Sequence, residues 1–470
     1  MFKRESEGIN KEKRVGFVGL GRSNLSVMEG LKPGTEVVLR SDKRILRSGN
    51  FITSIIRGED LRDWLLPKVG EAIPKNVTVV GIYDEGRALS EISENVLVLS
   101  PSVRRDRTEL LEAAGRGIRL TSDAQLFFDK APCNVLAVTG SAGKSTTATL
   151  AHLMLGGKDG GSVLIGNVGS PMWNAPKEAR FYVCELSSFM LSYCSGLIER
   201  SVITNITPNH LDWHSSFEEY RDSKLSVSAL SRECVICADD PILSEWIGRK
   251  KIFSVASINL PLKELVSRHR AELYMTVEDG YICRNGEKIF DTGGLYRTDD
   301  ATLTNACLAV ALCSGHSATE RIVSALCGFR GLSHRGETVG IRDGVKYVNS
   351  SIDTTPERSI ATMKAINEQV ILLLGGRGKG LSYEPLLPWI LRYAKRVVCF
   401  GEEGDKIGFA INGAVPTVCV RKFSDAVRAA MLYAKRGDVV LLSPACTSYD
   451  EFSSFEERGD EFRRIVSEDK

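Results

Sequence analysis

Short apolar runs alternate along this chain with longer stretches in which apolar and polar residues recur at helical spacing. The runs are rich in valine, leucine and isoleucine, as is typical of strands buried on both faces of a parallel sheet. Strands that alternate with helices predict an α/β fold. The predicted strands, with the turns that follow some of them, are 14–26, 37–42, 77–82, 96–101, 135–147, 181–185, 201–205, 233–237, 251–255, 346–351, 370–376, 396–401 and 438–444.

The grouping of these strands predicts three α/β domains. Residues 1–130 form a Rossmann-like N-terminal domain, and residues 131–332 form a central domain that begins near a glycine-rich turn. The central domain ends in a helical stretch, 305–327, followed by a glycine-rich linker. Residues 333–470 form a second Rossmann-like domain. The total of 470 residues is ample for several domains of ordinary size.

Composition excludes several classes of protein. The 61 basic and 59 acidic residues nearly cancel, which argues against binding nucleic acid through bulk charge. The 12 cysteines are scattered, mostly in apolar runs, and are expected to be reduced thiols in a cytoplasmic protein. The charged N-terminus does not resemble a signal peptide, and no apolar run is long enough to span a membrane.

The segment from Gly140 to Thr146 predicts a phosphate-binding loop. It follows an apolar run and reads Gly-Ser-Ala-Gly-Lys-Ser-Thr, so that Gly140, Ser141, Ala142, Gly143, Lys144, Ser145 and Thr146 would cradle phosphates. Lys144 supplies a point charge, and the Ser145 hydroxyl is a possible Mg²⁺ ligand. Val138 occupies the position of the first glycine of a full Walker A motif. The competing interpretation is an ordinary glycine-rich turn between a strand and a helix.

A second glycine-rich turn follows the first predicted strand. Gly19 and Gly21 match the start of a dinucleotide fingerprint, but Asn24 holds the position of its third glycine. A redox cofactor is therefore less favoured here than another nucleotide-like ligand at the carboxyl end of the sheet.

Three further residues follow the phosphate loop in an order that suggests a shared site. Glu185 ends a predicted strand, His210 follows another, and Lys224 lies on a predicted helix. A carboxylate at the end of a parallel strand faces the ligand side of the sheet, and a neutral imidazole can bind a metal ion or orient a phosphate. Taken singly, the three residues also fit a solvated strand end, a packed or capping histidine and a surface lysine.

These motifs together resemble the ATP-dependent Mur ligase family. The resemblance rests on Gly140–Thr146, on Glu-Leu-Ser-Ser-Phe at 185–189, on Asn-Ile-Thr-x-x-His-Leu-Asp at 205–212 and on the Lys224 segment. Gly-Asn-Val-Gly at 166–169 and His334-Arg335 match the family as well. The segment 442–459 is similar to the C-terminal signature of the branch that adds D-glutamate, so the resemblance extends over all three predicted domains.

The resemblance implies an ATP-dependent ligase that joins D-glutamate to UDP-N-acetylmuramoyl-L-alanine through an acyl phosphate, in the synthesis of peptidoglycan precursors. It implies a monomer that uses two Mg²⁺ ions and whose Lys224 is carbamylated. The implied catalytic residues are Lys144, His210, Lys224 and Arg335, with metal ligands Ser145, Glu185, His210 and carbamylated Lys224. ATP would contact 140–146, Asn305 and Arg335; the UDP substrate would contact Gly19, Leu20, Gly21, Arg22, Ser23, Ser41, Asp42, Asn167 and His210; D-glutamate would contact Ser448 and Phe455.

The chain also departs from the family pattern. Ile352 replaces a lysine expected to contact D-glutamate, and Ala301-Thr302 replaces a His-Asn pair near the adenine, although Asn305 is kept. Ser350 replaces an aspartate of the family pattern; Asp353 is expected to replace that acid in part, whereas no cation replaces the lysine. The alternatives are a Mur-type ligase with another acceptor, a folylpolyglutamate synthase, a MurT-like amidating partner, or a nucleotide-binding relative without catalysis.

Overall fold

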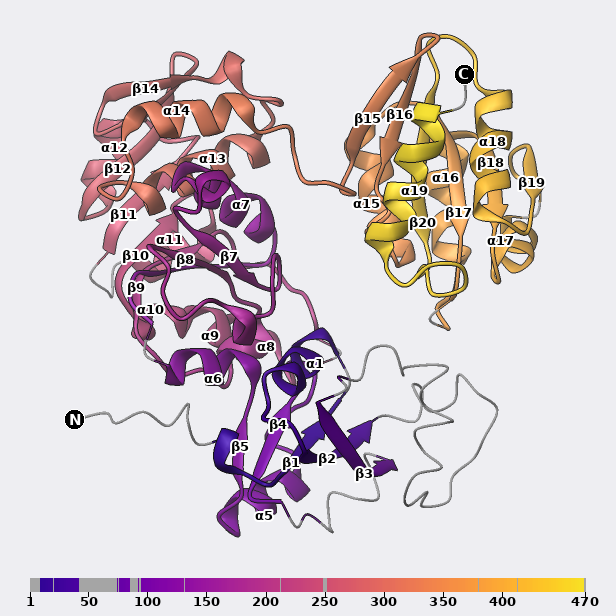
Figure 1. The fold of residues 1–470 in the computed structure, drawn as a ribbon. Helices are drawn as coiled ribbons and strands as arrows, with labels where there is room; N and C mark the ends of the chain where they lie inside the picture. The colour runs from indigo at the N-terminus through magenta and orange to yellow at the C-terminus, as the bar shows by residue number, and fades with distance from the viewer. Residues whose placement is uncertain are drawn as a thin grey trace. The chain divides into compact units, whose positions relative to one another are not determined.

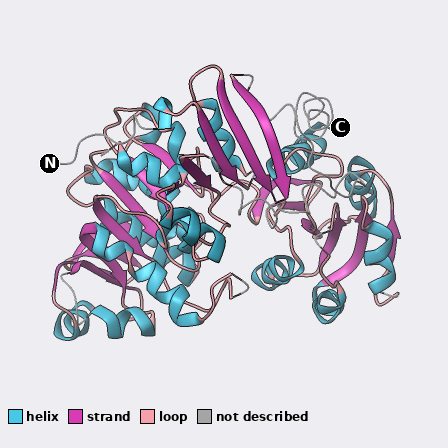
Figure 2. Cartoon of the chain, turned by 90° about the horizontal axis from the view of Figure 1, so that it is seen from below, coloured by secondary structure: helices cyan, strands magenta, loops and turns pink. Residues whose placement is uncertain are grey.

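The computed structural model describes residues 9–19, 21–41, 74, 76–84, 92, 94–130, 132–211, 213–247, 252–378, 380–411 and 413–468. These residues form three sheets, each built largely from parallel strands with helices packed against them (Figures 1 and 2). The α/β fold predicted from the alternating apolar runs is thus confirmed. Among the helices of the described residues, none has the length and apolar character needed to cross a membrane.

The first sheet has the strand order β3-β2-β1-β4-β5, and every pairing in it is parallel. Val15, Phe17 and Val37 lie in its core, because these strands are buried on both faces. With β1 in the middle, the ligand side of such a sheet is the carboxyl edge of β1 and β4. Its elements are η1 (Ile9–Lys11), β1 (Arg14–Val18), α1 (Arg22–Glu29), β2 (Thr35–Ser41), β3 (Val77–Asp84), β4 (Val96–Leu99), α5 (Thr108–Gly115), β5 (Arg119–Thr121) and α6 (Asp123–Asp129).

The second sheet has the order β14-β13-β12-β11-β10-β9-β6-β8-β7. β6 lies between β9 and β8, so the loop that follows β6 emerges from the interior of the sheet. Its strands are β6 (Val135–Thr139), β7 (Val163–Gly166), β8 (Tyr182–Glu185), β9 (Ile198–Ile203), β10 (Ser231–Cys237), β11 (Ile252–Ser257), β12 (Ala271–Glu278), β13 (Tyr281–Arg284) and β14 (Glu287–Asp291). Its helices are α7 (Lys144–Met154), η3 (Gly157–Asp159), η4 (Met172–Asn174), α8 (Ser188–Leu191), α9 (Phe217–Leu225), α10 (Val227–Leu230), α11 (Pro241–Ile247), α12 (Leu262–Arg268), η5 (Thr292–Gly294), α13 (Asp300–Cys313) and α14 (Thr319–Gly328).

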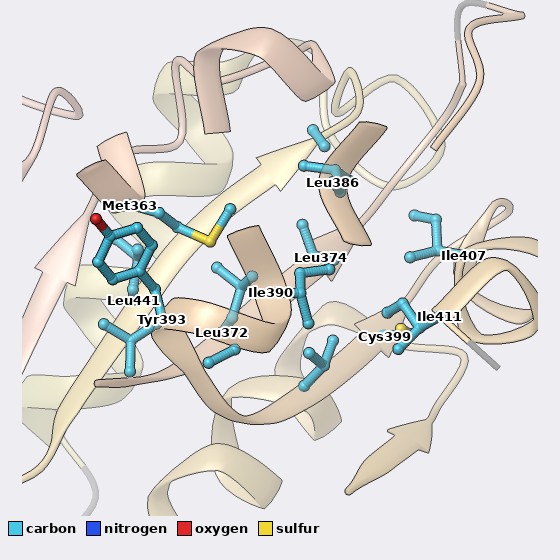
Figure 3. Close-up of a cluster of buried hydrophobic side chains, with 14 of the residues drawn as sticks. Met363, Leu372, Leu374, Leu386, Ile390, Tyr393, Cys399, Ile407, Ile411 and Leu441 are labelled. Atoms are coloured by element: carbon cyan, nitrogen blue, oxygen red, sulfur yellow. The ribbon is translucent and has the colours of Figure 1, made fainter. Parts of the chain in front are cut away.

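The third sheet has the order β15-β16-β20-β17-β18-β19, with only its edge strand β15 antiparallel among the described pairings. One face is covered by the apolar cluster drawn in Figure 3, where Leu372, Leu374 and Leu441 meet Met363 and Ile390. Its strands are β15 (Glu337–Arg342), β16 (Val345–Asn349), β17 (Val370–Gly375), β18 (Ala394–Phe400), β19 (Thr417–Cys419) and β20 (Val439–Ala445). Its helices are α15 (Pro356–Ile366), η6 (Glu384–Leu386), α16 (Leu387–Tyr393), α17 (Gly404–Ile411), α18 (Phe423–Tyr433) and α19 (Phe455–Glu468).

The compact units of the chain differ in number from its sheets. The first unit, Met1–Phe329, holds the first two sheets, and the second unit is Arg330–Lys470. The division into three domains at 130 and 332 therefore remains a prediction. The sequence pattern missed β12, which is parallel to β11, and the antiparallel strands β13 and β14 beyond it, because charged residues interrupt their apolar positions.

Candidate active site

The loop between β6 and α7 has a backbone that requires glycine at two positions. Gly140 has φ 141° and Gly143 has φ 81°, both outside the range that other residues favour. A Cβ atom on Gly140 would lie 1.9 Å from Oγ1 of Thr204, and one on Gly143 would lie 2.2 Å from Oδ1 of Asn305. The close approach of these two neighbours, as well as the turn itself, therefore excludes larger residues.

Thr204 and Asn205, which follow β9, hold this loop through hydrogen bonds. Asn205 accepts a hydrogen bond from Ala142 N at 2.9 Å through its side chain and one from Ser141 N at 2.9 Å through its carbonyl. Its Nδ2 donates to the Ala142 carbonyl at 3.1 Å, and Thr204 Oγ1 donates to the same carbonyl at 2.6 Å. Sequence reasoning noted Asn205 as part of a motif but gave it no role. Its role is to hold the shape of the phosphate loop.

Lys144 and Ser145 open helix α7 directly after the loop. Lys144 Nζ donates to the carbonyls of Gly140 at 2.8 Å and Ser141 at 3.1 Å, so its charge lies over the loop. Ser145 is buried in the first turn, and the N-cap Gly143 provides no side-chain cap for the first N–H groups. Uncapped N–H groups, the helix dipole and a nearby ammonium group together favour an anion.

Asn305 on α13 contacts both the loop and the first turns of α7. Asn305 lies on α13, is buried, and accepts a hydrogen bond from Thr147 Oγ1 at 3.2 Å. Its Oδ1 is the atom that a Cβ on Gly143 would meet. The predicted ATP-binding residues 140–146 and Asn305 are therefore neighbours in space. Thr302 lies at the position of the missing adenine-contacting pair. Its N–H donates a hydrogen bond at 3.0 Å to Asp299, the N-cap residue of α13.

Lys224 lies on α9 and is only 2% exposed, although it carries an amine. Its Nζ donates to the Gly140 carbonyl at 2.7 Å and lies 4.7 Å from the centre of the Tyr220 ring. Burial, with a smaller contribution from Lys144, lowers the pKa of Lys224 to about 6, while Glu185 opposes the shift. The amine is therefore largely neutral at neutral pH.

Glu185 ends β8 and is 1% exposed. Its Oε1 accepts a hydrogen bond from Asn167 Nδ2 at 2.9 Å. Its Oε2 is buried and has no hydrogen-bond partner within the described part of the chain. A buried carboxylate with one oxygen left unpaired fits a divalent cation, because Mg²⁺ prefers oxygen ligands and accepts water and phosphate for the remainder.

His210 adopts a left-handed backbone, φ 54°, just after β9. Its imidazole is exposed and meets the rings of Phe189 at 5.0 Å and Tyr220 at 6.5 Å between centroids. No group of three or more histidine, cysteine, aspartate or glutamate side chains in the described ranges could by itself hold a metal ion. A Mg²⁺ site here would depend on hydroxyl, water, phosphate or carbamate oxygens in addition to Glu185.

The predicted UDP-binding turn lies at the carboxyl end of β1. Gly19 has φ 82°, and a Cβ there would come within 2.7 Å of Ser100 Cβ. Buried Asn24 donates to the carbonyls of Val18 at 3.0 Å and Gly19 at 2.8 Å, so it braces the turn where a dinucleotide fingerprint would have glycine.

The other residues of the predicted UDP site are only partly described. Arg22 Nη2 lies 3.4 Å from the Asn167 carbonyl, which brings two of them together, and Gly21 and Ser23 flank Arg22 at the start of α1. Leu20 and Asp42 lie outside the described residues. Ser41 is the last residue of β2 and lies opposite Asp84 of β3.

Arg335 belongs to the second compact unit, so its approach to the phosphate loop stays a prediction. Its neighbour His334 is buried with φ 62°, and Nδ1 of His334 lies 3.1 Å from Nδ2 of Asn349. A Cβ on Gly459 would lie 2.1 Å from that same Nδ1, so His334 packs directly on α19.

The predicted amino-acid contacts lie at the carboxyl edge of the third sheet. Ser448 follows β20 and is buried, and Phe455 begins α19. Arg458 is fully buried and donates to the Thr447 carbonyl at 3.0 Å and to Ser351 Oγ at 3.0 Å, while Ser351 Oγ donates to the Phe455 carbonyl at 2.8 Å. These bonds tie the Ser448 and Phe455 segments together. The sequence motif contained Arg458 but did not reveal that it is buried.

Ile352 and Asp353, where the chain departs from the family pattern, follow strand β16 and make defined hydrogen bonds. Asp353 is buried, and its Oδ2 accepts hydrogen bonds from Thr362 Oγ1 and Ser443 Oγ, both at 2.7 Å. Burial raises the pKa of Asp353. The only positive group that donates a described hydrogen bond to Ile352 is Arg358, whose Nη1 lies 3.1 Å from the Ile352 carbonyl.

Comparisons with known proteins agree with this geometry. Residues 138–313 match the model of the Mur ligase middle domain, and residues 334–446 match that of the Mur ligase glutamate ligase domain. A UDP-N-acetylmuramoylalanine--D-glutamate ligase of Chlamydia caviae is 33% identical over 80% of this chain and 84% of its own. One of Acetivibrio thermocellus with the same name is 32% identical over 97% of both chains. The solved UDP-N-acetylmuramate-alanine ligase MurC of Thermotoga maritima shares the fold, with a TM-score of 0.56 at 16% identity over 97% of this chain and all of its own.

Proposed function

This chain belongs to the Mur ligase family, and we propose that it joins D-glutamate to UDP-N-acetylmuramoyl-L-alanine with hydrolysis of ATP. Relatives that bear this activity in their names match 80% and 97% of the chain, at 33% and 32% identity. The observation that carries the proposal is the convergence of Lys144 Nζ and Lys224 Nζ on the Gly140 carbonyl, beside the buried carboxylate of Glu185. Two amines and a carboxylate around a phosphate loop suit transfer of a phosphoryl group.

The reaction that fits this site has two chemical steps. A carboxylate oxygen of the UDP substrate attacks the γ-phosphorus of ATP, which releases ADP and forms an acyl phosphate. The amine of D-glutamate then attacks the acyl carbon, loses a proton, and expels phosphate to leave an amide. Negative charge builds up on phosphoryl oxygens in the first step, and Lys144 with the N–H groups of the loop would stabilise it.

Lys224 is proposed to carry a carbamate. The neutral amine favoured by its burial is the form that attacks CO₂, and the product is a carboxylate-like oxygen donor. Together with Ser145, Glu185 and His210 it would supply ligands for two Mg²⁺ ions. When bound, these ions would neutralise phosphate charge and orient the γ-phosphate.

The remaining substrates are assigned to the two flanking sheets. The UDP portion would lie at the carboxyl edge of the first sheet, near Gly19, Arg22 and Asn167. D-Glutamate would lie at the carboxyl edge of the third sheet, near Ser448 and Phe455, and Arg335 would reach the ATP phosphates. We further propose that the protein works in the cytoplasm as a monomer.

The acceptor is tested by measuring phosphate release from ATP with Mg²⁺ and UDP-N-acetylmuramoyl-L-alanine, once with D-glutamate and once with each of a panel of other D- and L-amino acids. The proposal expects release with D-glutamate. Ile352 and the inward-turned Asp353 favour one alternative, a Mur-type ligase with another acceptor. Release with a different amino acid only would establish that alternative and reject D-glutamate.

A further inference from the structure

The candidate histidine His210 is held by a turn that is closed through its own backbone. The N–H groups of Trp213 and His214 both donate to the His210 carbonyl, at 3.1 and 2.9 Å. The three residues are called the His210 turn below. The imidazole of His210 is exposed, so burial of the side chain does not fix it. The Phe189 ring contacts the imidazole, and the position of the backbone that carries it depends on what anchors the turn.

One anchor is the start of helix α8, which follows strand β8 of the second sheet. His214 is buried, and its Nε2 lies 3.0 Å from Ser188 Oγ, three residues beyond Glu185. The His214 ring stacks on Phe189 with centroids 5.8 Å apart. These contacts connect the turn to the segment that carries the carboxylate of the site.

The other anchor comes from the first sheet, through Arg104. Its guanidinium donates to the Trp213 carbonyl, lies 5.1 Å from the centre of the Trp213 indole, and forms an ion pair with Glu219 at 3.2 Å. Glu219 in turn accepts a hydrogen bond from Ser215 N at 2.7 Å and lies 3.5 Å from His214 Nδ1. Arg104 thus touches the His210 turn directly and again through Glu219.

The segment of Arg104 is itself well fixed. Trp213 Nε1 donates to the Ser102 carbonyl at 2.7 Å, and Arg105 N donates to Tyr193 Oη at 2.9 Å. Asp106 pairs with the same guanidinium and orients it. Because side-chain and backbone bonds hold the arginine from both flanks, little conformational entropy remains to be lost when it holds the turn.

The loop that carries Arg104 lies beside the proposed nucleotide site of the first sheet. It follows β4 directly, at the carboxyl edge where Ser100 abuts Gly19. That edge is the one to which the UDP substrate is assigned. Ser100 precedes Arg104 by four residues in the chain. A ligand that packs against Ser100 and Gly19 therefore contacts the same segment that carries the arginine anchoring the His210 turn.

We propose that Arg104 is a positioning residue that couples occupancy of the first-sheet nucleotide edge to the placement of His210 beside the phosphate loop. The coupling rests on the proposed function, since the nucleotide in question is the UDP substrate. Arg104 touches no reacting atom in this scheme. It acts by setting the His210 turn in the geometry needed for phosphoryl transfer.

The test compares Arg104→Gln and Arg104→Lys with wild type, with Arg107→Gln as the matched control. Arg107 lies three residues further along the same segment and forms an ion pair with Glu109 at 3.9 Å. In Arg104→Gln we expect kcat to fall about tenfold or more, since small misplacements of a catalytic group are costly, with the KM for D-glutamate changed less than about twofold. Arg104→Lys keeps the ion pair with Glu219 but loses the fork, so it should be intermediate.

Hydrogen exchange of the backbone supplies a readout that loss of stability alone would not mimic. In wild type, UDP-N-acetylmuramoyl-L-alanine without ATP should slow exchange in peptides covering 205–216. In Arg104→Gln the ligand should still bind by calorimetry, but the slowing should disappear. Unchanged kcat in Arg104→Gln, or slowing equal to that of wild type, would overturn the coupling.

Failure of the proposed function would look different. If wild type releases phosphate with another amino acid only, the D-glutamate assignment fails, and the exchange experiment still tests the coupling. If UDP-N-acetylmuramoyl-L-alanine does not bind wild type at all, both the substrate assignment and the coupling to it are rejected. An equal loss of kcat in Arg107→Gln would reject a specific role for Arg104.

Discussion

Replacing Lys224 by methionine should raise the stability of the protein while it abolishes most of its activity. The buried amine has a pKa of about 6, whereas lysine in the unfolded chain titrates near 10.5. At pH 7.5 the native side chain is therefore neutral in about 97% of molecules, against about 0.1% for an ordinary lysine. Deprotonation across three pH units at about 1.36 kcal/mol each costs folding about 4 kcal/mol.

Methionine fills a similar volume and does not incur this cost. It loses the hydrogen bond from Nζ to the Gly140 carbonyl, a loss of about 1 kcal/mol. Lys224→Met should therefore be more stable by up to about 3 kcal/mol in CO₂-depleted buffer at pH 7.5. Because the native pKa is lowered, the difference should be fully present below pH 6 and should vanish as the pH rises toward 10.5.

Activity should change in the opposite direction. Without an amine no carbamate can form, and we expect kcat to fall at least about 100-fold, or about 2.7 kcal/mol of transition-state stabilisation. The assay is phosphate release with all three substrates, and stability is measured by urea unfolding. Arg221→Met is the control, because Arg221 lies on the same helix but is half-buried at the surface and pairs with Asp222. A Lys224→Met enzyme with kcat within about threefold of wild type, or with a lower unfolding midpoint, would refute the reasoning.

Other predictions address the site and its surroundings. Lys224→Ala should regain part of its activity with formate or acetate, which can occupy the place of the carbamate; no regain would argue against a carboxylate role there. Gly315→Ala should lose about 1–2 kcal/mol because of its positive φ, and Gly143→Ala should lose more, because its Cβ would also press on Asn305; only Gly143→Ala should raise the KM for ATP about tenfold. Burial lowers the pKa of His152, so its protonation favours the unfolded chain and stability is lost as the pH falls through the ordinary histidine range. His152→Gln should therefore have a shallower dependence of unfolding free energy on pH between 5.5 and 7.5; an unchanged slope would contradict the burial argument.

The sequence pattern predicted the α/β fold because buried parallel strands leave continuous apolar runs. It did not predict the order of the strands, since each run can pair with several others at little difference in local energy. The pattern missed β12 to β14, at one end of the second sheet, because these strands carry charged residues, such as Glu272 and Glu287, among their apolar positions. Strand order and edges are set by tertiary packing.

The candidate site was predicted best where backbone geometry restricts the residue. Gly140 and Gly143 are such positions, and the structure explains both through the close approach of Thr204 and Asn305. The burial of Lys224 could not be predicted, because its helix also carries Glu218, Arg221 and Asp222, which are typical of a solvated face. The roles of Asn205 and Arg104 depend on contacts between distant segments, for which the sequence carries no local signal.

The most direct test of the central claim follows the oxygen atoms of the substrate. UDP-N-acetylmuramoyl-L-alanine labelled with ¹⁸O in both carboxylate oxygens is turned over with ATP, Mg²⁺ and D-glutamate, and the phosphate and product are analysed by mass spectrometry. An acyl phosphate intermediate predicts one ¹⁸O atom in each phosphate released and one in the new amide. Unlabelled phosphate, ¹⁸O in AMP, or no amide formed with D-glutamate would contradict it.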